Sequence, residues 1–206
     1  MTGAAASFYF DLASPLAYLA AERVLHVLPG PAQWRPVLAR ELPSGEAFDS
    51  FRCGEEEEIF RAEVARRARE LALQPLRWPD PFPYDSALAM RVASYAASIG
   101  RGVAYAQAAF RQAFAGGHSL EQLDHVLIAA AACEMHPAAV KAAASRPSLA
   151  RALARSTAQA AARGVREVPA VLVGERVFHG ERGLEQAAAQ MAASSAQAAP
   201  AGAGRR

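Results

Sequence analysis

The hydrophobic and polar positions divide the chain into three zones, and the first zone alternates between strand and helix. A short run rich in aromatic residues over 5–12 predicts a buried strand. The apolar stripe from Leu16 to Leu28 predicts a helix directly after it. A second strand is predicted over Gln33–Leu38, where Pro36 indicates an edge strand or the strand's end. The chain therefore opens as strand, helix, strand.

The second zone, from about residue 54 to 164, is helical in period almost throughout. Its apolar stripes run over 59–71, 88–99, 103–114, 120–131 and 147–160. The third zone returns to strands, with β-rich runs over Ala170–Val173 and Arg176–His179 separated by a short turn. A last helix is predicted through Leu184 and Met191.

This order of elements predicts an α/β fold, because removing the helical zone leaves a thioredoxin-type sheet. We expect a thioredoxin-like domain formed by 1–45 and 160–193, with a large α-helical insertion over 46–159. Residues 194–206 are mostly Ala, Ser, Gly and Pro with two terminal arginines. Such a segment buries little apolar surface, so we expect a disordered tail.

Composition agrees with a helix-rich chain and excludes several partners. Alanine, the best helix former, supplies 52 of the 206 residues, which favours helices packed through small side chains. A net charge of +2 without a basic stripe argues against nucleic acid, and no apolar run suits a membrane span or a secretion signal. Two cysteines far apart make neither a disulfide framework nor a metal pair. We therefore expect a cytoplasmic protein.

Two absences restrict the chemistry further. Lys141 is the single lysine beside 21 arginines, and the chain contains no asparagine. Any mechanism that needs an active-site Asn is therefore excluded, and any mechanism that needs Lys must use Lys141.

The junction between the first strand and the first helix is the strongest candidate for chemistry. A thioredoxin-type layout places a C-x-x-C pair there, because the helix N-terminus stabilises a thiolate. Here Ser14 and Ala17 occupy the two cysteine positions, so the chain has no dithiol for disulfide exchange. The Ser14 hydroxyl can donate a hydrogen bond to a thiolate carried by a ligand and lower the thiol pKa. The alternative is that Ser14 only caps the helix.

A second junction, Val168-Pro169, precedes the third predicted strand. A proline that starts a strand and faces the first helix suits a cis peptide, and the backbone of Val168 could then pair with an extended thiol peptide. The alternative is an ordinary trans proline that opens a strand.

The two junctions together resemble a known family. The segments that carry the resemblance are FYFDLASPLAYLA, WRP, PLRWPDPFPYD and GVREVPAVLVGERVFHG. They are similar to 2-hydroxychromene-2-carboxylate isomerase, which belongs with the kappa-class glutathione transferases in the DsbA-like branch of the thioredoxin fold. The similarity runs from about Ser7 to Ala193.

The resemblance implies a glutathione-dependent isomerase or a kappa-type glutathione transferase that works as a homodimer. Glutathione would lie along Val168 and Pro169, with its sulfur facing Ser14. The thiolate would add reversibly to a conjugated, pyruvate-bearing aromatic substrate, so that a double bond becomes a rotatable single bond.

The resemblance also implies residues for both ligands. The substrate would lie near Arg77, Trp78 and Phe82, with Arg77 pairing a substrate carboxylate. Relatives often read G-x-D-R, whose Asp holds the γ-glutamyl end of glutathione; Glu181 and Arg182 stand at that place in this sequence.

Other candidates carry less weight. The acidic run after Cys53 argues against a reactive thiolate, and Cys133 is expected to pack in the core. His118 and His125 have weak metal-ligand spacing, so no metal site is predicted. His179 lies beside the expected ligand loop.

A function from a different class is also compatible with the sequence. The chain would then be a non-catalytic DsbA-like binding protein, or a protein that uses another small thiol. Disulfide oxidoreductase activity is disfavoured because the second thiol is missing.

Overall fold

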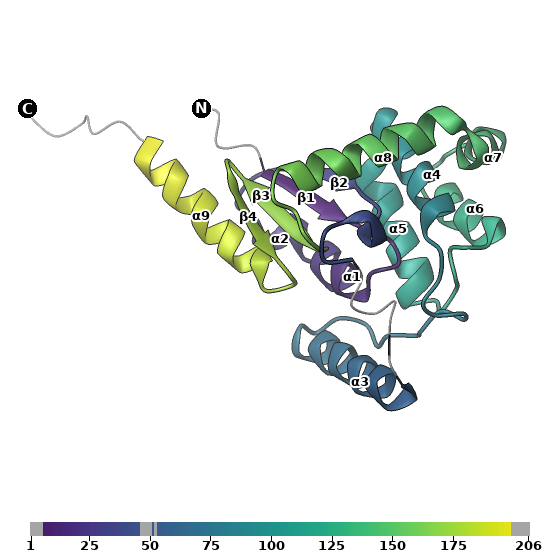
Figure 1. The fold of residues 1–206 in the computed structure, drawn as a ribbon, viewed down its shortest axis with the longest axis horizontal. Coiled ribbons are helices and arrows are strands. Elements are labelled where there is room, and N and C mark those ends of the chain that lie inside the picture. The colour runs from purple at the N-terminus through teal and green to yellow at the C-terminus, as the bar shows by residue number, and fades with distance from the viewer. Residues whose placement is uncertain (1–5, 46–50, 52, 199–206) are drawn as a thin grey trace, which may run out of the picture.

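A four-stranded mixed sheet forms the centre of the computed structural model, which describes residues 6–45, 51 and 53–198 (Figure 1). The strands are β1 (Ala6–Phe10), β2 (Ala32–Pro36), β3 (Ala170–Val173) and β4 (Arg176–His179). Their order is β2-β1-β3-β4, with β1 parallel to β2 and antiparallel to β3, and β3 antiparallel to β4. The sheet thus has the expected thioredoxin-like topology.

Helices cover the sheet and build the rest of the chain. They are α1 (Pro15–Ala21), α2 (Val24–Val27), the 3₁₀ turn Ala39–Glu41, α3 (Gly54–Glu70), α4 (Ala87–Ser98), α5 (Gly102–Phe114), α6 (Leu123–Ala131), α7 (Pro137–Ser145), α8 (Pro147–Ala162) and α9 (Gly183–Ala198). Helix α9 packs on β3 and β4, whereas α4 and α8 contact β2 and α5 packs on α1.

The two faces of the sheet follow the alternation of side chains along each strand. Phe8 and Phe10 belong to the large core, where Phe10 meets Phe110 of α5 at 5.8 Å between ring centroids. Tyr9 and its cross-strand partner Ala170 belong to a smaller cluster with Ala160 of α8. Both faces are therefore covered, as expected for an α/β fold.

Helix α8 joins the helical zone to the sheet. Thr157 Oγ1 accepts a hydrogen bond from the Leu38 amide at 2.9 Å, and Ser156 Oγ donates to the Pro36 carbonyl at 2.9 Å. The expected domain boundary at residue 160 falls inside this helix. Pro36 ends the edge strand β2, two residues before the predicted end at Leu38.

Helix α3 differs from the other helices of the insertion. Figure 1 shows it apart from the α4–α7 group, and only Val64 and Ala68 are buried along its length. Helix α3 contacts α1, so it lies close to the start of the thioredoxin-like domain.

Two sequence expectations differ from the structure. The stripe from Leu16 to Leu28 forms two short helices because the chain turns at Glu22 and Arg23. Helix α9 continues to Ala198, so residues 194–198 are helical where we expected a disordered tail, and 199–206 lie outside the described residues. Alanine's helix propensity accounts for this extension. No helix in the described part of the chain has the length and apolar character of a membrane span.

Candidate functional site

Ser14 begins α1 as its N-cap. Its backbone is extended (φ −85°, ψ 114°), and its Oγ accepts a hydrogen bond from the Ala17 amide at 3.2 Å. Pro15 follows at the first helical position, where its missing N–H costs nothing. The residue is 1% exposed, and its hydroxyl proton has no acceptor among the described residues. The hydroxyl thus caps the helix through its oxygen and keeps a proton to donate.

The peptide bond between Val168 and Pro169 is cis, which is the first of the two alternatives that the sequence left open. The Pro169 carbonyl accepts from the Gly180 amide at 2.8 Å, which ties this loop to the residue after β4. The Val168 N–H and C=O have no backbone partner among the described residues. They are free to pair with an extended ligand.

The sheet brings the two junctions to the same end of its inner strands, β1 and β3. Tyr9 near the end of β1 lies opposite Ala170 at the start of β3. The segment that leads from β1 to Ser14 and the segment that leads from Pro169 into β3 therefore lie at the same end of these two strands.

Asp11 is a site residue that sequence reasoning missed. Its two carboxylate oxygens accept from the Ala13 amide at 3.0 Å and the Ala39 amide at 2.9 Å. Burial raises the pKa of Asp11, whereas these backbone donors and the Ser86 hydroxyl act in the opposite direction. The Ser14 amide donates to the Asp11 carbonyl at 3.1 Å, so Asp11 fixes the loop that carries Ser14. The only sequence signal is an acidic residue directly after a buried aromatic strand.

A cavity of about 470 Å³ opens beside these junctions, and we call it the α3 pocket. Leu16 of α1 and Phe60 and Val64 of α3 form its apolar wall. Its polar wall is the segment 179–182 between β4 and α9, together with charged residues of α3. Since Gly180 is bonded to Pro169 and Leu16 closely follows Ser14, the pocket adjoins both junctions.

Glu181 lines this pocket, but its carboxylate is already paired. One oxygen bonds to the Arg23 guanidinium, and the other accepts from Arg67 Nε at 2.8 Å. The hydrogen bond to Glu181 raises the pKa of Arg67. Glu181 therefore joins α9 to α3 and to the α1–α2 turn, whereas Arg182 is exposed at the same pocket. Sequence reasoning missed both arginine partners.

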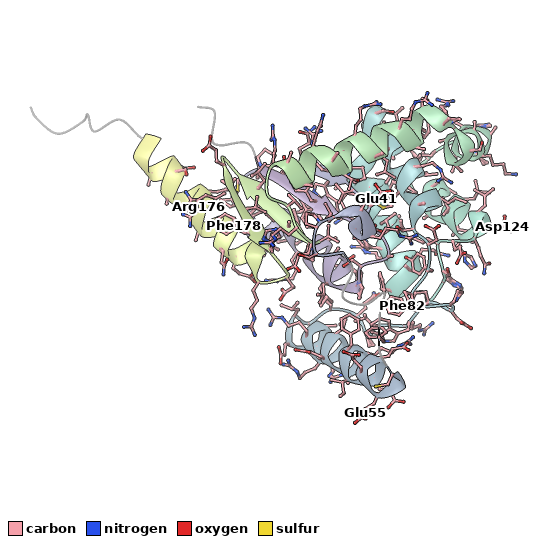
Figure 2. The ribbon with its side chains drawn as sticks, in the orientation of Figure 1. Glu41, Glu55, Phe82, Asp124, Arg176 and Phe178 are labelled. Carbon is pink, nitrogen blue, oxygen red and sulfur yellow. The ribbon has the colours of Figure 1, made fainter. Side chains whose placement is uncertain are left out.

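The residues expected around the substrate separate into two groups. Trp78 and Phe82 contact each other edge to face, with ring centroids 4.8 Å apart. The cation over both rings is the Arg61 guanidinium, 4.8 Å from the Trp78 centroid and 5.4 Å from that of Phe82. Figure 2 shows Phe82 next to α3, on the side that faces the rest of the chain.

Arg77 is exposed, and its backbone amide donates to the Phe114 carbonyl at 2.8 Å. Phe60 lies 6.1 Å from Trp78 between ring centroids and also lines the α3 pocket. The aromatic residues therefore adjoin the pocket, and Arg61 is a fourth residue that the sequence did not reveal.

The remaining candidates lie elsewhere or have structural partners. Cys53 is exposed before α3, whereas Cys133 is buried and burial raises its pKa. The rings of His118 and His125 lie 4.8 Å apart, and no group of three metal-binding side chains occurs among the described residues. His179 Nε2 accepts from the Arg166 amide at 3.1 Å, so its proton is on Nδ1.

Comparison with solved structures shows the same fold in proteins of low identity. The chain is similar to 2-hydroxychromene-2-carboxylate isomerase, with a TM-score of 0.82 and 18% identity over 93% of this chain and 96% of that chain. A probable DsbA oxidoreductase from Streptomyces coelicolor gives a TM-score of 0.76 and 17% identity over 97% and 93% of the two chains. The cytosolic disulfide reductase DsbM from Pseudomonas aeruginosa, solved with GSH, gives 0.64 and 15% over 94% and 98%.

Comparison with curated proteins gives no match. The family model described as a DSBA-like thioredoxin domain matches residues 6–192. This match spans both halves of the sheet and the whole helical insertion, and the structural similarities agree with it. The chain therefore belongs to the DSBA-like thioredoxin domain family.

Proposed function

We propose that this protein binds a small thiol of the glutathione class and uses it to isomerise or conjugate an aromatic substrate. The observation that carries this proposal is the unpaired backbone of Val168 before cis Pro169, at the end of the sheet where Ser14 begins α1. An extended thiol peptide can pair with the Val168 backbone through main-chain hydrogen bonds. The similarity to DsbM, which was solved with GSH, supports a thiol of this kind.

Ser14 acts on the sulfur of the bound thiol. Its oxygen accepts from the Ala17 amide, which leaves the hydroxyl proton to donate to a thiolate. A hydrogen bond to the charged form lowers the pKa of the thiol and raises the fraction that is nucleophilic. The chain itself supplies no thiol there, because Ser14 and Ala17 replace a cysteine pair.

The reaction we propose is reversible addition. The thiolate forms a carbon–sulfur bond at one end of a double bond conjugated to a carbonyl, and the displaced electron pair moves to the carbonyl oxygen as an enolate. The former double bond is then single and rotates. Collapse of the enolate restores the double bond and expels the thiolate, so the thiol is regenerated.

The aromatic residues beside the α3 pocket suit such a substrate. Trp78, Phe82 and Phe60 offer ring faces and edges for stacking. The Arg61 guanidinium over two of these rings is paired with Glu57 through Nε at 2.8 Å and Nη2 at 2.6 Å. Its remaining N–H donors can bind a substrate carboxylate at the edge of the stack. We assign the carboxylate-binding role that was expected of Arg77 to Arg61 in this proposal.

Calorimetry and the ultraviolet absorbance of the thiolate test the proposal. Glutathione should bind, and its bound thiol should ionise below its solution pKa. Ser14→Ala removes the donor and should abolish this pKa shift, whereas Ser14→Thr retains a hydroxyl and should preserve much of it. Ser98→Ala, an exposed serine at the end of α4, is the matched control and should leave the shift unchanged. Absence of binding to folded protein would rule out this thiol.

A second candidate is a thiol-binding protein without turnover. Ser14 is 1% exposed and already caps α1, which is the arrangement that a purely structural serine would have. This candidate predicts that Ser14→Ala lowers the free energy of unfolding by about 1 kcal/mol through the lost cap and leaves thiol affinity unchanged.

We also propose that the protein works in the cytoplasm. A reduced thiol ligand and the free cysteines Cys53 and Cys133 both suit a reducing compartment.

A further inference from the structure

A second cavity lies between the sheet and α8, and we call it the α8 pocket. It measures about 380 Å³, and none of its lining residues lines the α3 pocket. Tyr9 of β1 and Arg35 of β2 are partners in the parallel strand pair, so their side chains leave the same face of the sheet. Gln159 of α8 and Arg163 at its C-terminal cap stand four residues apart, so they share one face of that helix. Three elements thus bring polar side chains to one cavity.

The wall of the α8 pocket carries two positive charges and no acidic residue. Arg35, Arg163 and Gln159 have no side-chain hydrogen bond or ion pair within the described part of the chain. Ser156 is the exception among the polar lining residues, because its hydroxyl donates to the Pro36 carbonyl at 2.9 Å. The remaining lining residues are alanines. An anion that enters this cavity therefore meets two guanidinium groups whose N–H donors are available.

Tyr9 distinguishes this cavity from a pair of surface arginines. Its side chain packs with Ala160 and Ala170 in the smaller core cluster, and the residue is 5% exposed. The Tyr9 hydroxyl has no hydrogen-bond partner among the described residues, but it is not sealed in the core, since Trp34 Nε1 is the sealed polar atom without a partner there. Buried tyrosine hydroxyls usually have a partner, so this one offers an unused hydrogen bond to whatever occupies the cavity.

The charges of the two arginines also favour an anion. A cation at a helix C-terminus is favourable by itself, which accounts for Arg163 but not for Arg35 on its strand. Glu175 lines a neighbouring cavity with Arg163, yet no ion pair joins these two residues. Two guanidinium groups at one cavity repel each other, and an anion bound by both removes this repulsion.

We infer that the α8 pocket binds the phosphate group of a small molecule. A phosphate group carries close to two negative charges and three acceptor oxygens, which match Arg35, Arg163 and the Tyr9 hydroxyl better than a carboxylate does. The volume lies within the range of about 300–1,000 Å³ typical of small-molecule sites, so an organic group can accompany the phosphate. This site goes beyond the proposed thiol function, because the two cavities share no lining residue.

Calorimetry on the full chain with inorganic phosphate and with phenyl phosphate tests the inference, at about pH 8 where both are largely dianions. Arg35→Gln and Arg163→Gln should each raise the dissociation constant about tenfold, because each removes a charged hydrogen-bond donor. Tyr9→Phe keeps the ring in the core and should weaken binding several-fold through the lost hydroxyl. Arg155→Gln is the matched control: this exposed arginine of α8 does not line the pocket, and its loss should change affinity by less than about twofold.

The two ligands and the control variant separate the outcomes, once thermal unfolding has shown that each variant is folded. Tighter binding of phenyl phosphate supports the inference with an organic phosphate ester as the ligand, and equal or weaker binding supports the same site with free phosphate. The inference is overturned if the folded native chain binds neither ligand at millimolar concentration. It is also overturned if Arg155→Gln weakens binding as much as Arg35→Gln does, since general attraction to exposed arginines would then account for the binding.

Discussion

Asp11 places a carboxyl group inside the loop that holds Ser14. It is 1% exposed and bonds to the amides of Ala13 and Ala39, so one side chain joins the start of α1 to the segment after β2. A group in this position serves Ser14 by fixing its loop, and we regard Asp11 as a positioning residue. Burial removes water from the Asp11 carboxyl group, which disfavours its charged form and raises its pKa.

Asp11→Asn should lower the free energy of unfolding by about 1–3 kcal/mol, because the NH2 group that replaces one carboxylate oxygen cannot accept from the backbone N–H that faces it. The pKa of Asp11 in the folded chain is raised above its ordinary value of 3.8. Its contribution to stability is therefore fully present below that value and is lost as pH rises through the folded pKa. The stability gap between native chain and variant should shrink over this range.

Denaturant unfolding at a series of pH values measures that gap. A gap that widens with rising pH would show that hydrogen bonding to the carboxylate outweighs its desolvation. Asp85→Asn, an exposed aspartate that caps the Ala87 amide, is the control and should not reproduce the trend.

At the scale of elements, α3 is held to the rest of the chain by few contacts. Val64 and Ala68 are its buried residues. Beyond them, Arg67 bonds to Glu181 and Arg61 covers the rings of Trp78 and Phe82. A helix with so little buried apolar surface depends on its polar anchors more than the α4–α5 pair does.

Arg67→Gln should lower the free energy of opening α3 by about 1–2 kcal/mol, because Glu181 loses a charged hydrogen-bond partner. Amide hydrogen exchange should therefore accelerate in α3 and stay unchanged in α5. Arg66→Gln is the matched control: the neighbouring arginine pairs with Glu63 and Glu70 of the same helix, so its loss removes no link to the sheet. Equal acceleration in both variants would contradict an anchoring role for Arg67.

At the scale of the whole molecule, local patterns predicted much of the fold and part of the site. The cis Val168–Pro169 junction and the Ser14 cap were both accessible, because each depends on residues adjacent in sequence. Arg23 and Glu181 stand 158 residues apart, so their contact arises only when α9 packs beside the α1–α2 turn. The periodic pattern of apolar residues along the sequence does not indicate a pair of this kind.

The cations near Trp78 and Phe82 show the same dependence on tertiary packing. Arg77 directly precedes Trp78 in the sequence, and this proximity favoured it as the cation that pairs with a substrate carboxylate. Arg61 lies a full turn before Val64 on α3 and reaches the rings only through the docking of that helix. Side-chain roles that depend on tertiary docking are therefore the part of the site that the sequence alone could not supply.

The abundance of alanine is a property of the whole chain, and the α4–α5 contact shows its use. Ala89, Ala93 and Ala96 of α4 and Ala106 and Ala109 of α5 are buried, which allows close approach of the two helices.

Ala109→Leu adds three carbons to this closely packed contact and should lower the free energy of unfolding by about 1–3 kcal/mol, since side chains and backbone must shift to admit it. Ala104→Leu on the exposed face of the same helix has equal helix propensity and should change stability by less than about 0.5 kcal/mol. Chemical denaturation of both variants measures the difference. Equal effects would mean that the α4–α5 contact accommodates a larger side chain. The abundance of alanine would then favour helix formation in this protein and not close packing.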